Sequence, residues 1–148
     1  MADPMITRTT FAGRGVVRQW DPSANEDVAS WPDVAADAIR AVNHLTGNGH
    51  PIPAPVAYEV LGNLAALAHR LPQALTPLAQ GLNRSMDEFT VTDSAGDPRT
   101  SATTAVEALT LAAQLAEQVG AALAEAQQAI AGQGYDSDAP AAAEHEGS

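Results

Sequence analysis

TSATTAVEALTLAAQLAEQVGAALAEAQQAI, residues 100–130, is the stretch that decides the fold. Its apolar side chains recur at steps of three and four residues, the spacing that places side chains on one stripe of an α-helix. About thirty residues at a rise of roughly 1.5 Å give a helix about 45 Å long. Such a helix needs packing partners along its length, because amphipathic packing carries most helical stability in water. The stripe comprises Ala105, Leu109, Ala112, Leu115, Ala116, Val119, Leu123, Ala126 and Ile130.

A first helix is predicted to begin after Ser30 and to end at Gly47. Ser30 can cap the helix, Pro32 suits the first turn, and Asp33 completes a pattern like a capping box. Gly47 should end the helix, because glycine readily adopts the backbone conformation that follows a helix C-terminus. Residues 47–55 hold three prolines and two glycines and are predicted to be a loop. The apolar face of this helix comprises Trp31, Val34, Ala35, Ala38, Val42 and Leu45.

Two further helices are predicted to begin after Pro53 or Pro55 and to extend to Leu82, a segment in which one leucine stripe runs through two prolines. Pro72 lacks an N–H donor and disfavours helical geometry at Leu71, so the second helix should end or kink there. A third, short helix is expected to begin either at Pro72 or, with Thr76 as its cap, at Pro77. Residues 84–100 would connect it to the long helix.

The predicted fold class is all-α, a small helical bundle of three shorter helices packed on one long C-terminal helix. The bundle is expected over residues 30–132, with Thr100 or Ser101 capping the long helix and with Leu109, Val119 and Leu123 buried. Residues 1–29 are predicted to be a flexible or extended N-terminal arm, in which residues 9–20 could form a short strand or hairpin. Residues 133–148 are predicted to be a disordered acidic tail, because their composition cannot support a core.

Charge and composition exclude several classes of function. The 148 residues carry a formal net charge of -11, which speaks against direct binding to nucleic-acid phosphates. The chain has no cysteine, so disulfides, thiolate nucleophiles and cysteine-based metal sites are excluded. We find no apolar run of about 18 residues and no signal-peptide core, so we expect no membrane partner and a cytoplasmic protein.

No polar residues show the spacing of an enzyme, cofactor or metal site. The four histidines, His44, His50, His69 and His145, lack the spacing of a metal-ligand motif. Asp33 lies four residues before Asp37, near a helix N-terminus where the helix dipole accounts for both acids. We therefore expect no catalysis, no cofactor and no bound metal.

Two motifs of the small helical substrates of type VII secretion are absent. Their W-x-G turn is not met, because Trp31 is followed by Pro32 and Asp33. Their Y-x-x-x-[DE] signal is not met either, because the fourth residue after Tyr135 is Ala139. The sequence therefore supports no family assignment.

The leading functional prediction is a non-enzymatic protein–protein interaction module or small helical adaptor. One form of it is an oligomer that self-associates through the alanine-rich face of the long helix. The prediction rests on three features: the length of this helix relative to its neighbours, its alanines, which permit close helix approach, and the arginines and tryptophan of the arm. Tryptophan and arginine are enriched at binding hot spots. The candidate partner-binding residues are Arg14, Arg18, Trp20, Leu115 and Val119.

The alternative prediction is an acidic inhibitor that occupies the nucleic-acid-binding surface of a basic partner. It would use Glu107, Glu117 and Glu125, which share the polar face of the long helix. These three acids span about 27 Å at the rise of an α-helix, which is sparse beside one phosphate charge per roughly 1.7 Å of duplex. A solvated helix surface accounts for them equally well.

Overall fold

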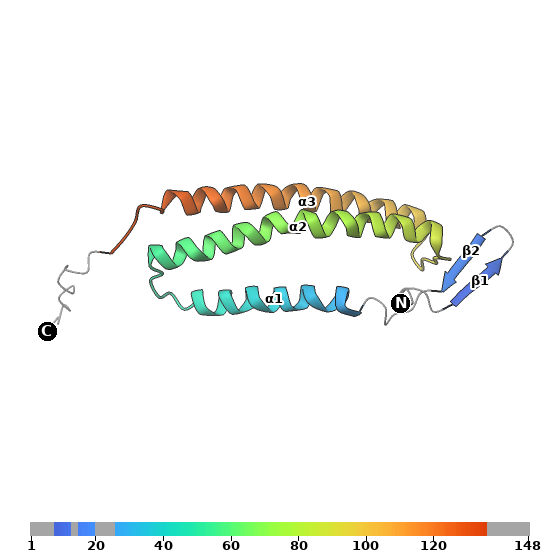
Figure 1. The fold of residues 1–148 in the computed structure, drawn as a ribbon, viewed down its shortest axis with the longest axis horizontal. Helices are drawn as coiled ribbons and strands as arrows, with labels where there is room; N and C mark the ends of the chain where they lie inside the picture. The colour runs from blue at the N-terminus through green and yellow to red at the C-terminus, as the bar shows by residue number, and fades with distance from the viewer. Residues whose placement is uncertain (1–7, 13–14, 20–25, 136–148) are drawn as a thin grey trace.

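The computed structural model describes residues 8–12, 15–19 and 26–135. Strands β1 (Arg8–Ala12) and β2 (Gly15–Gln19) form an antiparallel hairpin, with Thr10 opposite Val17. Three helices follow, α1 (Glu26–Thr46), α2 (Ala54–Glu88) and α3 (Pro98–Ala129), and they run alternately up and down the long axis of the molecule (Figure 1). The predicted helical class is confirmed for residues 26–129. In the N-terminal arm, where a short strand or a hairpin was predicted, the structure has a hairpin.

Helix α2 is continuous, so the prediction of a third, short helix is wrong. It spans 35 residues, with Pro72 and Pro77 both inside it. A proline in a helix interior removes a hydrogen bond and costs about 3 kcal/mol. Packing of α2 against α3 along its length overrides that local penalty. Because α2 has 35 residues and α3 has 32, α3 is not longer than α2, and the predicted mismatch in helix lengths remains only against α1, which has 21 residues.

Helix α3 begins earlier than predicted, because Asp97 is its N-cap in place of Thr100 or Ser101. The Asp97 carboxylate accepts hydrogen bonds from the backbone N–H and the hydroxyl of Thr100, both at 2.9 Å. Both bonds lower the pKa of Asp97 below its usual value, and the bond from the backbone N–H has the larger effect. Pro98 then occupies the first turn, where its missing N–H has no cost. Ser101 donates its hydroxyl to Asp93 in the preceding connection.

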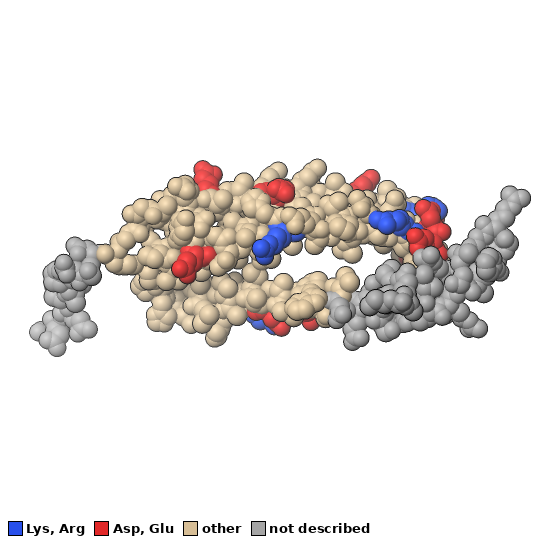
Figure 2. Space-filling view, in the orientation of Figure 1, with Lys and Arg blue, Asp and Glu red and all other residues tan. Residues whose placement is uncertain are grey.

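Helix α1 ends where it was predicted to end but begins earlier. Its last residue is Thr46, and the N–H of Gly47 donates to the carbonyl of Asn43 at 2.9 Å. Its first residue is Glu26, four residues before Ser30, so Pro32 lies inside the helix. No Cα atom of α1 lies within 8 Å of a Cα atom of α2 or α3. The space-filling view shows open space between α1 and the other two helices (Figure 2).

Small residues form the interior of the α2–α3 hairpin. The buried residues are Ala65, Ala68, Ala79, Ala102, Ala116 and Gly120. Among the described residues, no large side chain is fully buried. Leu109 and Leu123 are half-buried. The prediction that Val119 is buried is wrong, since 52% of it is exposed. Val119 precedes the buried Gly120 by one residue, which turns its side chain about 100° away from α2.

Two reciprocal contacts fix the register of α2 against α3. On α2, Gly62 leaves room for the side-chain amide of Gln127, which donates to the carbonyl of Tyr58 at 3.0 Å. On α3, Gly120 leaves room for the imidazole of His69. Each helix therefore supplies one glycine and one polar side chain, and the two glycine sites are seven residues apart on each helix. At the far end of the hairpin an ion pair joins α3 to α2, with Arg99 2.9 Å from Asp87.

Candidate protein-interaction surface

Large apolar side chains lie on the outside of the α2–α3 hairpin. Leu71 and Leu78 of α2 are 42% and 53% exposed, and Leu115 and Val119 of α3 are 50% and 52% exposed. The antiparallel register that places His69 beside Glu117 sets Leu71 next to Leu115 and Val119 along the hairpin axis. We call these four residues, Leu71, Leu78, Leu115 and Val119, the leucine face.

The four side chains emerge on the same side of the hairpin. At about 100° per residue, the side chain of Leu71 is rotated about 120° around the α2 axis from the buried Ala65. Around the α3 axis, Leu115 is rotated about 100° from the buried Ala116, in the same sense. The two helices run antiparallel, so offsets of the same sense carry both sets of side chains to one side. Leu111, which is 55% exposed, borders this side, because around the circumference of α3 it points between Leu115 and Glu107.

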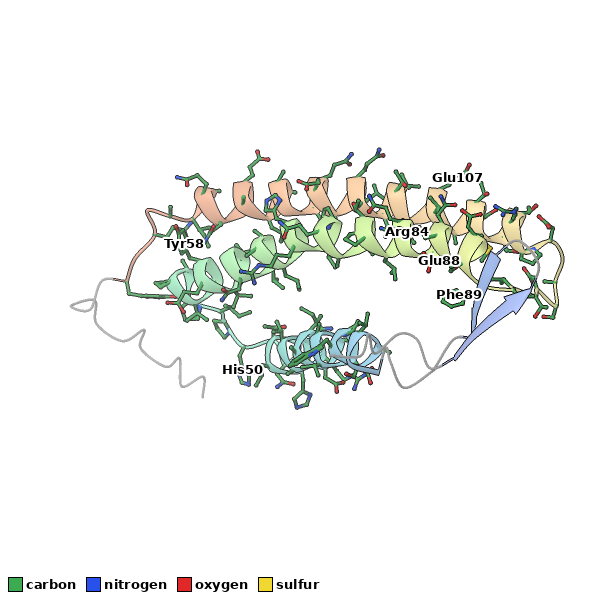
Figure 3. All side chains as sticks on the ribbon, turned by 45° about the vertical axis from the view of Figure 1, so that its right-hand side comes forward. His50, Tyr58, Arg84, Glu88, Phe89 and Glu107 are labelled. Atoms are coloured by element: carbon green, nitrogen blue, oxygen red, sulfur yellow. The ribbon has the colours of Figure 1, made fainter. Side chains whose placement is uncertain are left out.

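Charged side chains of both helices avoid the leucine face. At about 100° per residue, the acids and arginines of α2 and α3 fall on the remaining arc of each helix. Glu107, for example, lies on the side of α3 that faces away from α2 (Figure 3). Along the hairpin the leucine face is therefore an uncharged surface on an acidic chain. The charged residues concerned are Glu59, Arg70, Arg84, Asp87, Glu88, Arg99, Glu107, Glu117 and Glu125.

Helix α1 presents a second exposed apolar surface. Val28, Trp31, Val34 and Leu45 are 66%, 69%, 57% and 74% exposed. These residues belong to the apolar face that the sequence predicts, but in the structure α1 stands away from the hairpin. Both the helix and the hairpin thus leave apolar surface open to solvent.

The predicted partner-binding residues have different outcomes. Leu115 and Val119 are both exposed on the leucine face. Arg14 and Trp20 lie outside the described residues, and Arg18 lies in β2 opposite Thr9. The structure therefore brings two of the five candidates together.

Leu71 and Leu78 are not identified as surface residues in the sequence analysis; both belong to the leucine stripe of the second and third predicted helices. The signal was present in α2, because Ala65, Ala68 and Ala79 form one apolar stripe and the leucines form another. Two apolar stripes on one helix span more arc than a single neighbouring helix can cover. Recognising this would have predicted an exposed leucine surface.

The other features of the described residues are a groove between the helices, an imidazole–carboxylate pair and exposed glutamates. A groove of about 380 Å³ lies between α2 and α3, and none of the residues that line it is ionisable. No group of three or more potential metal ligands occurs in the described part of the chain. The imidazole Nδ1 of His69 lies 3.5 Å from a carboxylate oxygen of Glu117, and both side chains are about half exposed. Glu107 and Glu125 are exposed, and no feature distinguishes them from a solvated helix surface.

Within the described ranges, no helix has the length and apolarity needed to cross a membrane. Comparison of the chain with protein-family models, with curated proteins and with solved structures finds no match.

Proposed function

We propose that the chain is a non-enzymatic protein–protein interaction module that binds its partner through the leucine face. The observation that supports this function is the distribution of apolar residues: alanines fill the hairpin interior, while Leu71, Leu78 and Leu115 are about half exposed. In globular proteins leucine is among the residues most often buried. Clustered exposed apolar side chains are typical of binding surfaces.

The energetics favour covering this surface. Burying the exposed half of a leucine side chain stabilises a complex by roughly 1–2 kcal/mol, at about 25 cal/mol per Å² of apolar area. Four such side chains would contribute several kcal/mol, of which part offsets the entropy lost on association. Because the surface carries no charge, its binding should depend weakly on salt.

A capture experiment with the full chain as bait tests this function. The comparison is between the wild type, Leu115→Asp and Gln128→Asp. Gln128 is exposed on the same helix and points about 140° away from Leu115, so its substitution introduces the same charge outside the leucine face. Circular dichroism should confirm that both variants keep the helical content of the wild type.

We expect capture of a specific protein to survive washing at 1 M salt, to be lost in Leu115→Asp and to persist in Gln128→Asp. At this ionic strength charges are screened beyond about 3 Å. Release at moderate salt, or equal capture by both variants, would contradict binding through the leucine face.

A further inference from the structure

We infer that the leucine face binds a second copy of this chain, so that two α2–α3 hairpins pack face to face about a two-fold axis. This inference rests on the proposed function and names the partner. Three observations support it: the position of the face along the hairpin, the distribution of charge around it, and its size relative to α1.

The leucine face is centred on the hairpin. Leu71 is the middle residue of α2, and Leu115 lies within two residues of the middle of α3. A two-fold axis that lies in the interface plane and passes through this centre brings Leu71 and Leu115 close to their own counterparts in the second copy, as in an isologous interface. The same axis superimposes the full length of one hairpin on the other, so no part of the face is left uncovered.

The charge distribution removes the main obstacle to pairing two acidic chains. Each copy carries a formal net charge of -11, so random contact between copies is repulsive. The charged side chains of α2 and α3 lie off the leucine face. When two such faces meet, Glu107 and Glu125 of each copy point outward into solvent.

The side of the hairpin that carries the leucine face fits a second hairpin better than it fits α1. Helix α2 is about 50 Å long, and two helices 8–10 Å apart form a side roughly 18 Å wide, so this whole side measures about 900 Å², with the leucine face near its middle. This area is close to the roughly 800 Å² per partner of a stable interface. Helix α1, with 21 residues, is about 31 Å long and roughly 10 Å wide, so it would cover about one third of this side.

Sedimentation of the full chain over a range of concentrations tests the inference. We expect twice the monomer mass for the wild type. Leu71→Asp and Leu115→Asp should weaken the dimer more than about tenfold, because each buries a charge against an apolar surface. Gln128→Asp, on the opposite side of α3, and Leu45→Asp, on the exposed face of α1, should leave the dimer unchanged.

Cross-linking gives a second readout that does not require a disruptive substitution. The chain has no cysteine, so Leu115→Cys introduces a single thiol. Mild oxidation should join two Leu115→Cys chains, because the two-fold axis brings the two thiols together. Gln128→Cys, whose thiol would point about 140° away from position 115, should remain unlinked under the same conditions.

A wild type that stays monomeric at every concentration would overturn this inference, and further measurements would then identify what covers the face. If Leu115→Asp increases acrylamide quenching of Trp31 in a Trp20→Phe background, α1 occupies the face. If Leu115→Asp instead abolishes capture of another protein, the interaction function survives with a different partner. If neither measurement responds, the proposed function also fails.

Discussion

Replacing Gly120 with alanine tests whether the imidazole of His69 determines how closely α3 approaches α2. A Cβ atom at position 120 would lie 2.7 Å from Cε1 and 2.8 Å from Nε2 of His69. Alanine favours the helix by up to about 1 kcal/mol over glycine. Overpacking costs about 1–3 kcal/mol, and displacing His69 from Glu117 removes an exposed pair that contributes about 0–1 kcal/mol. The imidazole is half exposed and can rotate, so we expect a net loss near 1 kcal/mol.

The same substitution should have the opposite effect when His69 is absent. In a His69→Ala background the space above Gly120 is free, and Gly120→Ala should stabilise the chain by about 1 kcal/mol through helix propensity alone. The double-mutant cycle should therefore give a coupling of about 2 kcal/mol between the two positions. Urea unfolding of the four chains at one protein concentration measures it. An equal effect of Gly120→Ala in both backgrounds would refute the contact.

Three further substitutions test the hairpin. Gly62→Ala should destabilise it by about 1 kcal/mol by displacing the amide of Gln127, and the loss in urea stability should vanish in a Gln127→Ala background; an undiminished loss would contradict the contact. The pKa of Asp97 is lowered in the folded state, so its stabilising effect is present above pH 3.8 and is lost as pH falls below that value. The wild type should therefore exceed Asp97→Ala in urea midpoint at neutral pH, and this difference should shrink in acid, whereas a pH-independent difference would argue against the cap. Pro72→Ala should raise the free energy of unfolding by up to about 3 kcal/mol, and with it the melting temperature, because alanine restores a backbone N–H donor to the helix. A lower melting temperature would show that packing requires the proline.

The sequence predicted α3 well, because its apolar spacing repeats without interruption. It predicted the end of α1 at Gly47 for the same kind of local reason. It failed at Pro72, where the rule that proline ends a helix is local and the compensation is tertiary: contact with α3 holds α2 continuous through the proline. It failed in the same way at Asp97, since three candidate caps lie within five residues and only the geometry of the connection selects among them.

The candidate surface was predicted only in part. Periodicity shows that Leu71 and Leu115 are apolar and lie on helical stripes, but it does not show which stripe the neighbouring helix covers. The structure answers this through residue size, because the alanine stripe permits the closer approach of two helices and the leucine stripe is left outside. Val119 was predicted both to be buried in the bundle and to bind a partner. Because its side chain is exposed, the prediction of burial is wrong.

The two glycine sites have a consequence for the uniqueness of the folded state. An interface of alanines differs little from one helical turn to the next, so sliding one helix past the other by a turn would cost few contacts. Such a slide would move the imidazole of His69 and the amide of Gln127 off Gly120 and Gly62 and onto side chains at once. Replacing both glycines should therefore leave the helical content intact while several alignments coexist, broadening the amide resonances of both helices. The leucine face would then lose its shape without any change to its own residues.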